Sequence, residues 1–167
     1  MSQDEHKAGA PARVRCFVLT VSDTRTDATD TSGRAIRDLL TVAGHDVCGH
    51  AIVKDEPAEV VAVVSHQLSG AETQVVITTG GTGLTSRDST YEAIAGIIEK
   101  RLDGFGELFR MLSFEDVGPA AMLSRATAGT VGRAVVFILP GSEAAVRLAM
   151  SRLIVPELGH IAQQLAK

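Results

Sequence analysis

A short glycine-rich stretch followed by an arginine and an aspartate is the part of the sequence best suited to chemistry. Three glycines within residues 80–83 follow a β-branched run over 75–79, and Arg87 and Asp88 come next. Glycines just past a strand accept positive φ and let a ligand approach the backbone. Free N–H groups at such a turn, placed before a helix, favour an anion, most often a phosphate. The alternative is an ordinary tight turn, because the spacing matches neither the Walker loop nor the dinucleotide motif.

Other polar loops also follow predicted strands. Asp23 comes after the apolar run 14–21, and Asp55 comes after the run 47–53. In a parallel sheet the carboxyl ends of strands lie at one edge, so we expect Asp23, Asp55 and Asp88 to share a crevice with the glycine loop. Carboxylates beside phosphates typically hold Mg²⁺. The alternatives are a turn role for Asp23, a helix cap for Asp55, and a pairing of Asp88 with Arg87 or with the helix dipole.

The elements that must position these residues alternate along the chain. Apolar runs predict strands over 14–21, 47–53, 75–79 and 133–139. Periodic apolar residues, caps and prolines predict the helices, while residues 120–128 give no clear pattern. Ser89 and Glu92 have the spacing of a capping box. The order β-α-β-α-β predicts a three-layer α/β/α fold with a mostly parallel sheet. An apolar stripe over 36–43 predicts the first helix, and a second begins at Pro57. Further helices are expected over 90–100, over 102–117 after a glycine-marked bend, from Ser142 to Ile154, and from a restart at Glu157.

Length and composition fit one soluble domain. We expect a disordered tail over residues 1–12 and a single domain over 13–167. The formal net charge of −4, without a run of like charges, argues against nucleic acid as a partner. No stretch is apolar enough for a membrane span or a leader, so we expect a cytoplasmic protein. Cys16 and Cys48 lie in apolar segments and are expected to be buried free thiols.

Several motifs occur in a defined order: Val-Ser-Asp-Thr-Arg at 21–25, Lys-Asp-Glu at 54–56, Thr-Thr-Gly-Gly-Thr-Gly at 78–83, Arg-Asp at 87–88, Gly-Phe-Gly-Glu-Leu-Phe-Arg at 104–110, Met-Leu-Ser-Arg at 122–125 and Leu-Pro-Gly-Ser at 139–142. In type and order they resemble the MoaB/MogA family of molybdenum cofactor biosynthesis over residues 13–160. Phe-Arg-Met-Leu-Ser-Phe-Glu at 109–115 favours the MoaB branch.

The resemblance implies a molybdopterin-binding domain that transfers AMP from ATP to the molybdopterin phosphate with Mg²⁺. It further implies a homotrimer or a dimer of trimers, for which apolar residues within 108–123 are the candidate surface. Asp55 and Asp88 fall on the family's key acids and are the expected catalytic residues and metal ligands. Arg87 or Arg125 is expected to neutralise phosphate charge. The expected substrate-binding residues are Ser22, Asp23, Gly80, Gly81, Thr82, Gly83, Arg87, Ser124, Arg125, Pro140, Gly141 and Ser142.

Two other functions remain open on the sequence. One is a non-catalytic paralogue that binds molybdopterin or a nucleotide. The other is a nucleotide pyrophosphatase of a related type, which Thr82 and Leu84 disfavour. Ser86 and Glu143 stand where the family often has proline. Glu143 is expected to place a negative charge near an anion-binding loop.

Overall fold

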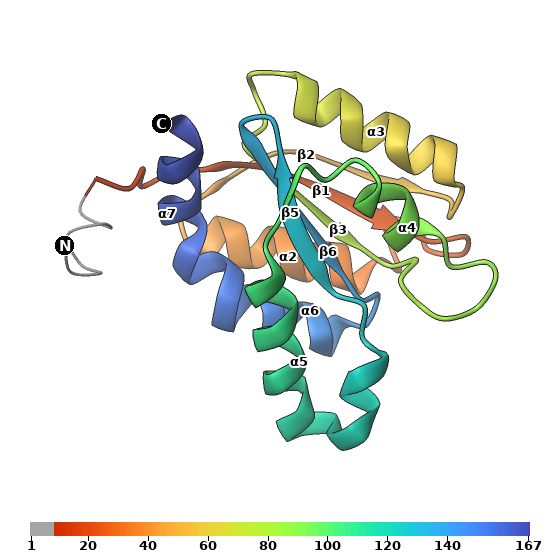
Figure 1. The fold of residues 1–167 in the computed structure, drawn as a ribbon. Coiled ribbons are helices and arrows are strands. Elements are labelled where there is room, and N and C mark those ends of the chain that lie inside the picture. Colours follow the sequence, from red (N-terminus) through yellow and green to blue (C-terminus); the bar gives the residue numbers. More distant parts are fainter. Residues whose placement is uncertain (1–8) are drawn as a thin grey trace.

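The computed structural model describes residues 9–167 and places a six-stranded sheet at the centre of the molecule (Figure 1). The strand order is β2-β1-β3-β6-β5-β4. β2, β1, β3 and β6 are parallel, whereas β5 pairs antiparallel with both β6 and β4. The mostly parallel sheet predicted from the sequence is therefore confirmed. The strands are β1 (Arg15–Val21), β2 (Asp46–Val53), β3 (Val75–Thr79), β4 (Lys100–Arg101), β5 (Thr127–Val131) and β6 (Ala134–Leu139).

Helices cover both faces of the sheet, as the three-layer prediction requires (Figure 1). On one face, Val60 and Val64 of α3 and Ile94 of α4 pack against β1, β3 and β6. On the other face α2, α5, α6 and α7 bury a larger aliphatic core. β3 and β6 are buried along their whole length, which explains their continuous aliphatic sequences. The helices are α2 (Thr31–Val42), α3 (Pro57–Ser69), α4 (Thr90–Ala95), α5 (Asp103–Val117), α6 (Glu143–Ala149) and α7 (Val155–Ala166).

The antiparallel edge of the sheet was not predicted. The helix expected over 90–100 ends at Ala95, and Lys100 and Arg101 form β4 instead. The unassigned segment 120–128 contains the end of a 3₁₀ helix, η1 (Gly118–Leu123), and the start of β5. Gly129 allows this edge to form, because a Cβ there would lie 2.6 Å from the carbonyl oxygen of Lys100. Pairing between strands, rather than local propensity, therefore determines the secondary structure of these segments.

The last helical segment is continuous, although a restart at Glu157 was predicted. α6 passes into one π-helical turn, η2 (Met150–Ile154), and then into α7. Pro156 directly follows the π-helical turn and has no N–H to donate, so the helix continues past it with one backbone hydrogen bond fewer. The bend expected at the start of α5 is also absent, since that helix begins directly at Asp103. Gly106 is instead required for close packing, because a Cβ there would lie 2.7 Å from the carbonyl oxygen of Ala126.

Two smaller expectations concern the amino terminus and the cysteines. The tail predicted over 1–12 falls mostly outside the described residues, and Ala10 and Pro11 lie against Gly159 of α7. Both cysteines are free. Cys16 is buried, and burial raises its pKa to about 12. Cys48 is exposed, contrary to prediction, because β2 forms the edge of the sheet. None of the helices within residues 9–167 has the length and apolar character that a membrane crossing requires.

Candidate functional site

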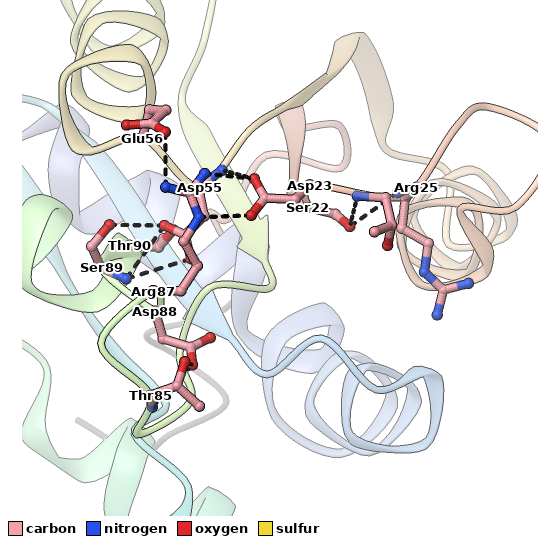
Figure 2. A network of polar contacts seen from close by, with 11 residues as sticks. Ser22, Asp23, Arg25, Asp55, Glu56, Thr85, Arg87, Asp88, Ser89 and Thr90 are labelled. Atoms are coloured by element: carbon pink, nitrogen blue, oxygen red, sulfur yellow. Dashed lines mark hydrogen bonds and ion pairs between the residues drawn. The ribbon is translucent and has the colours of Figure 1, made fainter.

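Loops from the carboxyl ends of β1, β2 and β3 meet at one edge of the sheet, and side chains join them directly (Figure 2). Asp23 after β1 accepts a hydrogen bond of 3.1 Å from the backbone N–H of Asp55 after β2. Arg87 after β3 donates to both carboxylate oxygens of Asp23, at 2.7 and 3.0 Å. Arg87 also pairs with Glu56 at 2.8 Å. The convergence predicted from strand order is therefore present for these three loops.

The first two glycines after β3 are fixed by backbone conformation and by close packing. Gly80 has φ of +98° and Gly81 has φ of +66°, a region that other residues rarely adopt. A Cβ on Gly80 would lie 2.1 Å from the carbonyl oxygen of Val21, the last residue of β1. A Cβ on Gly81 would lie 2.1 Å from the hydroxyl oxygen of Thr90. The glycines thus let the ends of neighbouring strands and the start of α4 approach one another.

Three of the four carbonyl groups of the glycine loop, defined as residues 80–83, are bound by protein donors. The N–H of Thr90 donates to the carbonyl of Gly81 at 3.1 Å. The guanidinium of Arg125 donates to the carbonyls of Thr82 and Gly83, at 2.9 and 2.6 Å. The N–H groups of Gly81 and Thr82, by contrast, have no acceptor within residues 9–167. A loop with bound carbonyls and free N–H groups is suited to an anion.

Asp55 holds the start of α4 against the glycine loop. Its side chain is buried and accepts hydrogen bonds from the Ser89 hydroxyl at 2.9 Å and the Thr90 hydroxyl at 3.2 Å. It also accepts from the Ser89 N–H at 3.3 Å. The capping box predicted at Ser89 is wrong in its bonding: α4 begins there, but the hydroxyl serves Asp55 instead of capping the helix. Asp55 does not cap α3 either, because Glu56 occupies that position.

Asp88 is held within its own loop. It accepts hydrogen bonds from the Thr85 hydroxyl and, at 3.1 Å, from the Thr85 N–H (Figure 2). The Thr85 hydroxyl, followed by the N–H groups of Thr85 and Gly83, lowers the pKa of Asp88 below its ordinary value. The carboxylate is therefore ionised at neutral pH. Arg87 pairs with Asp23 and Glu56, so the alternative pairing with its neighbour Asp88 is not observed.

Asp55 and Asp88 both border the glycine loop, and their role as magnesium ligands stays a prediction. A Cβ on Gly81 would lie 2.7 Å from an oxygen of Asp55, and a Cβ on Gly83 would lie 2.6 Å from an oxygen of Asp88. Both carboxylates therefore border the same loop. Residues 9–167 contain no group of three or more acidic, histidine or cysteine side chains that could hold a metal. Mg²⁺ commonly takes only one or two carboxylates and completes its shell with phosphate oxygens and water, so residue type alone is compatible with it.

Arg87 and Arg125, the two arginines of the site, both form ion pairs with carboxylates of the protein. Hydrogen bonds from Arg87 hold the pKa of Asp23 at about 2, and the same contacts raise the pKa of Arg87. Arg125 pairs with Glu92 in addition to its contacts with the loop carbonyls. Hydrogen bonding from Arg125 lowers the pKa of Glu92. The expected charge neutralisation of a ligand by either arginine remains a prediction.

A largely apolar cavity of about 430 Å³ opens beside the glycine loop. Thr82, Gly83 and Ser124 border it on one side, and the loop 140–142 borders it on another. The remaining wall comes mostly from α5, η1 and α6, including Phe109, Ser113, Asp116, Ala121 and Leu148. Ser113 and Asp116 were not singled out from the sequence. The available signal was their position four and seven residues after Phe109, on one face of a helix.

A second, smaller cavity of about 70 Å³ lies between the ends of β1 and β3, at the point where the strand order reverses. Ser22, Gly80 and Gly141 line it, as do the buried Thr20, Asp30 and Ser32. Sequence reasoning missed these last three. Thr20 donates to Asp30 at 2.7 Å, and Ser32 donates to the carbonyl of Gly141 at 2.7 Å. The first bond ties the end of β1 to the start of α2, and the second ties the loop after β6 to the start of α2.

The loop after β6 otherwise follows the prediction. Thr79 donates to the carbonyl of Pro140 at 2.8 Å, which ties this loop to the end of β3. Ser142 caps α6 by accepting from the N–H of Ala145 at 3.3 Å. Glu143 pairs with Arg147 at 2.8 Å, so a basic partner accompanies its negative charge.

The fold and the site together define a parallel α/β protein with a glycine loop and two carboxylates at the carboxyl edge of its sheet. Residues 17–160 match the family described as the probable molybdopterin binding domain. Molybdenum cofactor biosynthesis protein B of Bacillus cereus is 53% identical over 166 residues, which are 99% of this chain and 98% of that protein. The Bacillus subtilis protein of the same name is 50% identical over 168 residues, which are 100% of this chain and 99% of that protein. The chain belongs to the MoaB branch of this family.

Solved structures agree with this assignment. A crystal structure of a molybdenum cofactor biosynthesis protein B has a TM-score of 0.91 and 52% identity, covering 94% of this chain and 98% of that one. The tungsten cofactor synthesizing protein MoaB from Pyrococcus furiosus has a TM-score of 0.84 and 39% identity, covering 95% and 100%. A MogA structure has a TM-score of 0.80 at 25% identity, covering 90% and 99%.

Proposed function

We propose that this protein is a molybdopterin adenylyltransferase. An oxygen of the molybdopterin phosphate forms a bond to the α-phosphorus of ATP, the bond from that phosphorus to the bridging oxygen of the β-phosphate breaks, and pyrophosphate leaves. Such a transfer depends on positioning and charge neutralisation and needs no covalent nucleophile from the protein. Membership of the MoaB branch supports the molybdenum cofactor pathway, and the site supports the chemistry.

The observation that carries the proposal is the bonding of the glycine loop. The carbonyls of Gly81, Thr82 and Gly83 are bound by Thr90 and Arg125, and two carboxylates border the loop. The N–H groups of Gly81 and Thr82 have no protein acceptor among the described residues. The N–H groups would bind the phosphates of ATP, and Asp55 and Asp88 would hold Mg²⁺. When bound, that ion neutralises phosphate charge. The adjacent apolar cavity offers room for a flat ring system, either the pterin or the base.

A binding protein without turnover is the second candidate. It is favoured by the hydrogen bonds that Asp55 receives from Ser89 and Thr90 and that Asp88 receives from Thr85. Both carboxylates have structural roles in the absence of a metal. A protein without turnover would therefore also need Asp55 and Asp88, because they hold the loops around the site.

We also propose that the chain forms a trimer or a dimer of trimers through α5 and η1. Large apolar side chains are exposed there, with exposed fractions from 47% for Leu108 to 78% for Met122. A cluster of this kind on a protein surface typically marks an interface. The apolar surface of α5 and η1 comprises Leu108, Met111, Phe114, Val117, Met122 and Leu123.

The deciding experiment measures pyrophosphate release from ATP and Mg²⁺ with and without molybdopterin. Wild type should release pyrophosphate only when both are present, and Asp88→Asn should abolish release while leaving the fold intact. Asp38→Asn, at an exposed position of α2, serves as a charge-matched control and should retain full activity. If folded wild type binds molybdopterin and ATP but releases no pyrophosphate, the adenylyltransferase proposal is wrong and the binding role stands.

A further inference from the structure

Each nitrogen of the Arg125 side chain donates to a protein acceptor around the glycine loop. Its Nε donates to the carbonyl of Thr82 at 2.9 Å, and one Nη donates to the carbonyl of Gly83 at 2.6 Å. The other Nη pairs with Glu92 of α4. The guanidinium also stacks on the ring of Tyr91, 4.9 Å from its centre. Only 22% of the side chain is exposed, and each of its three nitrogens has an acceptor.

These contacts determine which way two N–H groups face, those of Gly83 and Leu84, which follow Gly81 and Thr82 along the chain. The N–H and C=O of a trans peptide point in opposite directions, and none of the described peptide bonds is cis. By holding the carbonyls of Thr82 and Gly83, Arg125 directs the N–H groups of Gly83 and Leu84 away from itself. The N–H of Gly83 accordingly contributes to lowering the pKa of Asp88. The N–H of Leu84 has no acceptor within residues 9–167 and is free for a ligand.

Arg125 is itself anchored by a separate helix. Arg110 of α5 donates to the carbonyl of Ser124 at 3.4 Å and to that of Ala126 at 3.1 Å, one residue on either side of Arg125. Gly106 makes room for this contact, because a Cβ there would lie 2.8 Å from a guanidinium nitrogen of Arg110. The backbone of Arg125 is thereby fixed to α5, while its side chain reaches the loop and α4.

We infer that Arg125 is a positioning residue, which orients the glycine loop through the Thr82 and Gly83 carbonyls and does not contact the anionic ligand. This inference rests on the proposed role of the loop in binding the phosphates of ATP. Glu92 then supports Arg125, because it pairs with the guanidinium nitrogen that does not bond the loop. It also differs from the charge-neutralising role that the sequence suggested for Arg125.

Glu92→Gln separates the two roles of Arg125, because they predict opposite effects on affinity. If Arg125 contacted phosphate, removing the carboxylate would free the guanidinium and tighten the binding of Mg²⁺–ATP. If Arg125 positions the loop, a weaker Glu92 contact loosens the guanidinium and weakens binding. We expect Glu92→Gln to weaken binding a few-fold and Arg125→Lys to weaken it about tenfold, since an ammonium cannot hold both carbonyls. Tighter binding by Glu92→Gln would overturn the inference.

Amide NMR of the unliganded protein tests the same inference without any ligand. In Arg125→Lys the resonances of Gly83 and Leu84 should shift, while that of Gly44, at the far end of α2, should not. Arg101→Lys is the matched control, because Arg101 lines one cleft together with Arg125 and bonds Tyr91 and Thr127 but not the loop. Unchanged Gly83 and Leu84 resonances in Arg125→Lys would overturn the positioning role. Failure of wild-type loop amides to respond to pyrophosphate or Mg²⁺–ATP would instead refute the proposed function.

Discussion

Replacing Asp55 by alanine should destabilise the protein much more than replacing Asp88, although both residues carry the same proposed metal role. Asp55 is only 6% exposed and accepts hydrogen bonds from Ser89 and Thr90. Losing hydrogen bonds to a charged acceptor costs about 2 kcal/mol. The wholly buried hydroxyl of Thr90 would then lack this acceptor, at a cost of about 2 kcal/mol more. We therefore expect Asp55→Ala to lower the free energy of unfolding by about 4 kcal/mol.

Asp88→Ala should lower the free energy of unfolding by only about 1 kcal/mol, because its partner Thr85 is exposed and water can replace the carboxylate. Urea denaturation followed by circular dichroism distinguishes the two variants. With a denaturant slope of about 2 kcal/mol per molar urea, the midpoint should fall by about 2 M for Asp55→Ala and about 0.5 M for Asp88→Ala. Asp55→Asn, which keeps one acceptor oxygen, should fall between them.

Equal midpoints for Asp55→Ala and Asp88→Ala would refute the structural role of Asp55. The distinction also governs how activity data are interpreted. Loss of turnover in Asp55→Ala combines a missing metal ligand with a loosened start of α4. Loss of turnover in Asp88→Asn reports on the metal ligand with little change in stability. Asp88→Asn is therefore the sharper test of the proposed chemistry.

Three further predictions follow from the backbone, the ion pairs and the apolar surface of α5 and η1. Gly80→Ala should lower the free energy of unfolding by about 3–5 kcal/mol. Gly44→Ala, where φ is positive but the space around the residue is open, should lower it by about 1–2 kcal/mol. Equal losses in urea denaturation would contradict the close packing at Gly80. Since Arg87 lowers the pKa of Asp23 from 3.8 to about 2, this pair contributes stability that is present above pH 3.8 and lost as the pH falls toward 2. Asp23→Asn should therefore flatten the pH dependence of urea midpoints in that window, and an unchanged slope would count against the pair. Phe114→Glu should dissociate the oligomer in sedimentation velocity at micromolar concentration, whereas an unchanged sedimentation coefficient would exclude this part of the surface.

The parallel part of the fold could be predicted because its signals are local. The aliphatic sequences of β1, β3 and β6 require burial on both faces, and this already indicates a central parallel sheet. Pro57 and Ser142 mark helix starts through their own backbone and side-chain chemistry. The antiparallel edge could not be predicted in the same way. β4 has two residues, and β5 contains Gly129, whose role depends on a neighbour about 30 residues earlier.

The sequence by itself determined which loops gather at the site, because strand order brings the loops after β1, β2 and β3 to one edge. Only the tertiary structure decided the partners within that edge. Arg87 bonds Asp23, 64 residues away, and not its neighbour Asp88. The Ser89 hydroxyl serves Asp55, 34 residues away, instead of its own helix. Arg125 donates to the carbonyl of Thr82, 43 residues away, a bond that the sequence did not predict. The physical reason is that local sequence fixes backbone conformation, whereas a polar side chain takes the acceptor that the folded chain places within about 3 Å of it.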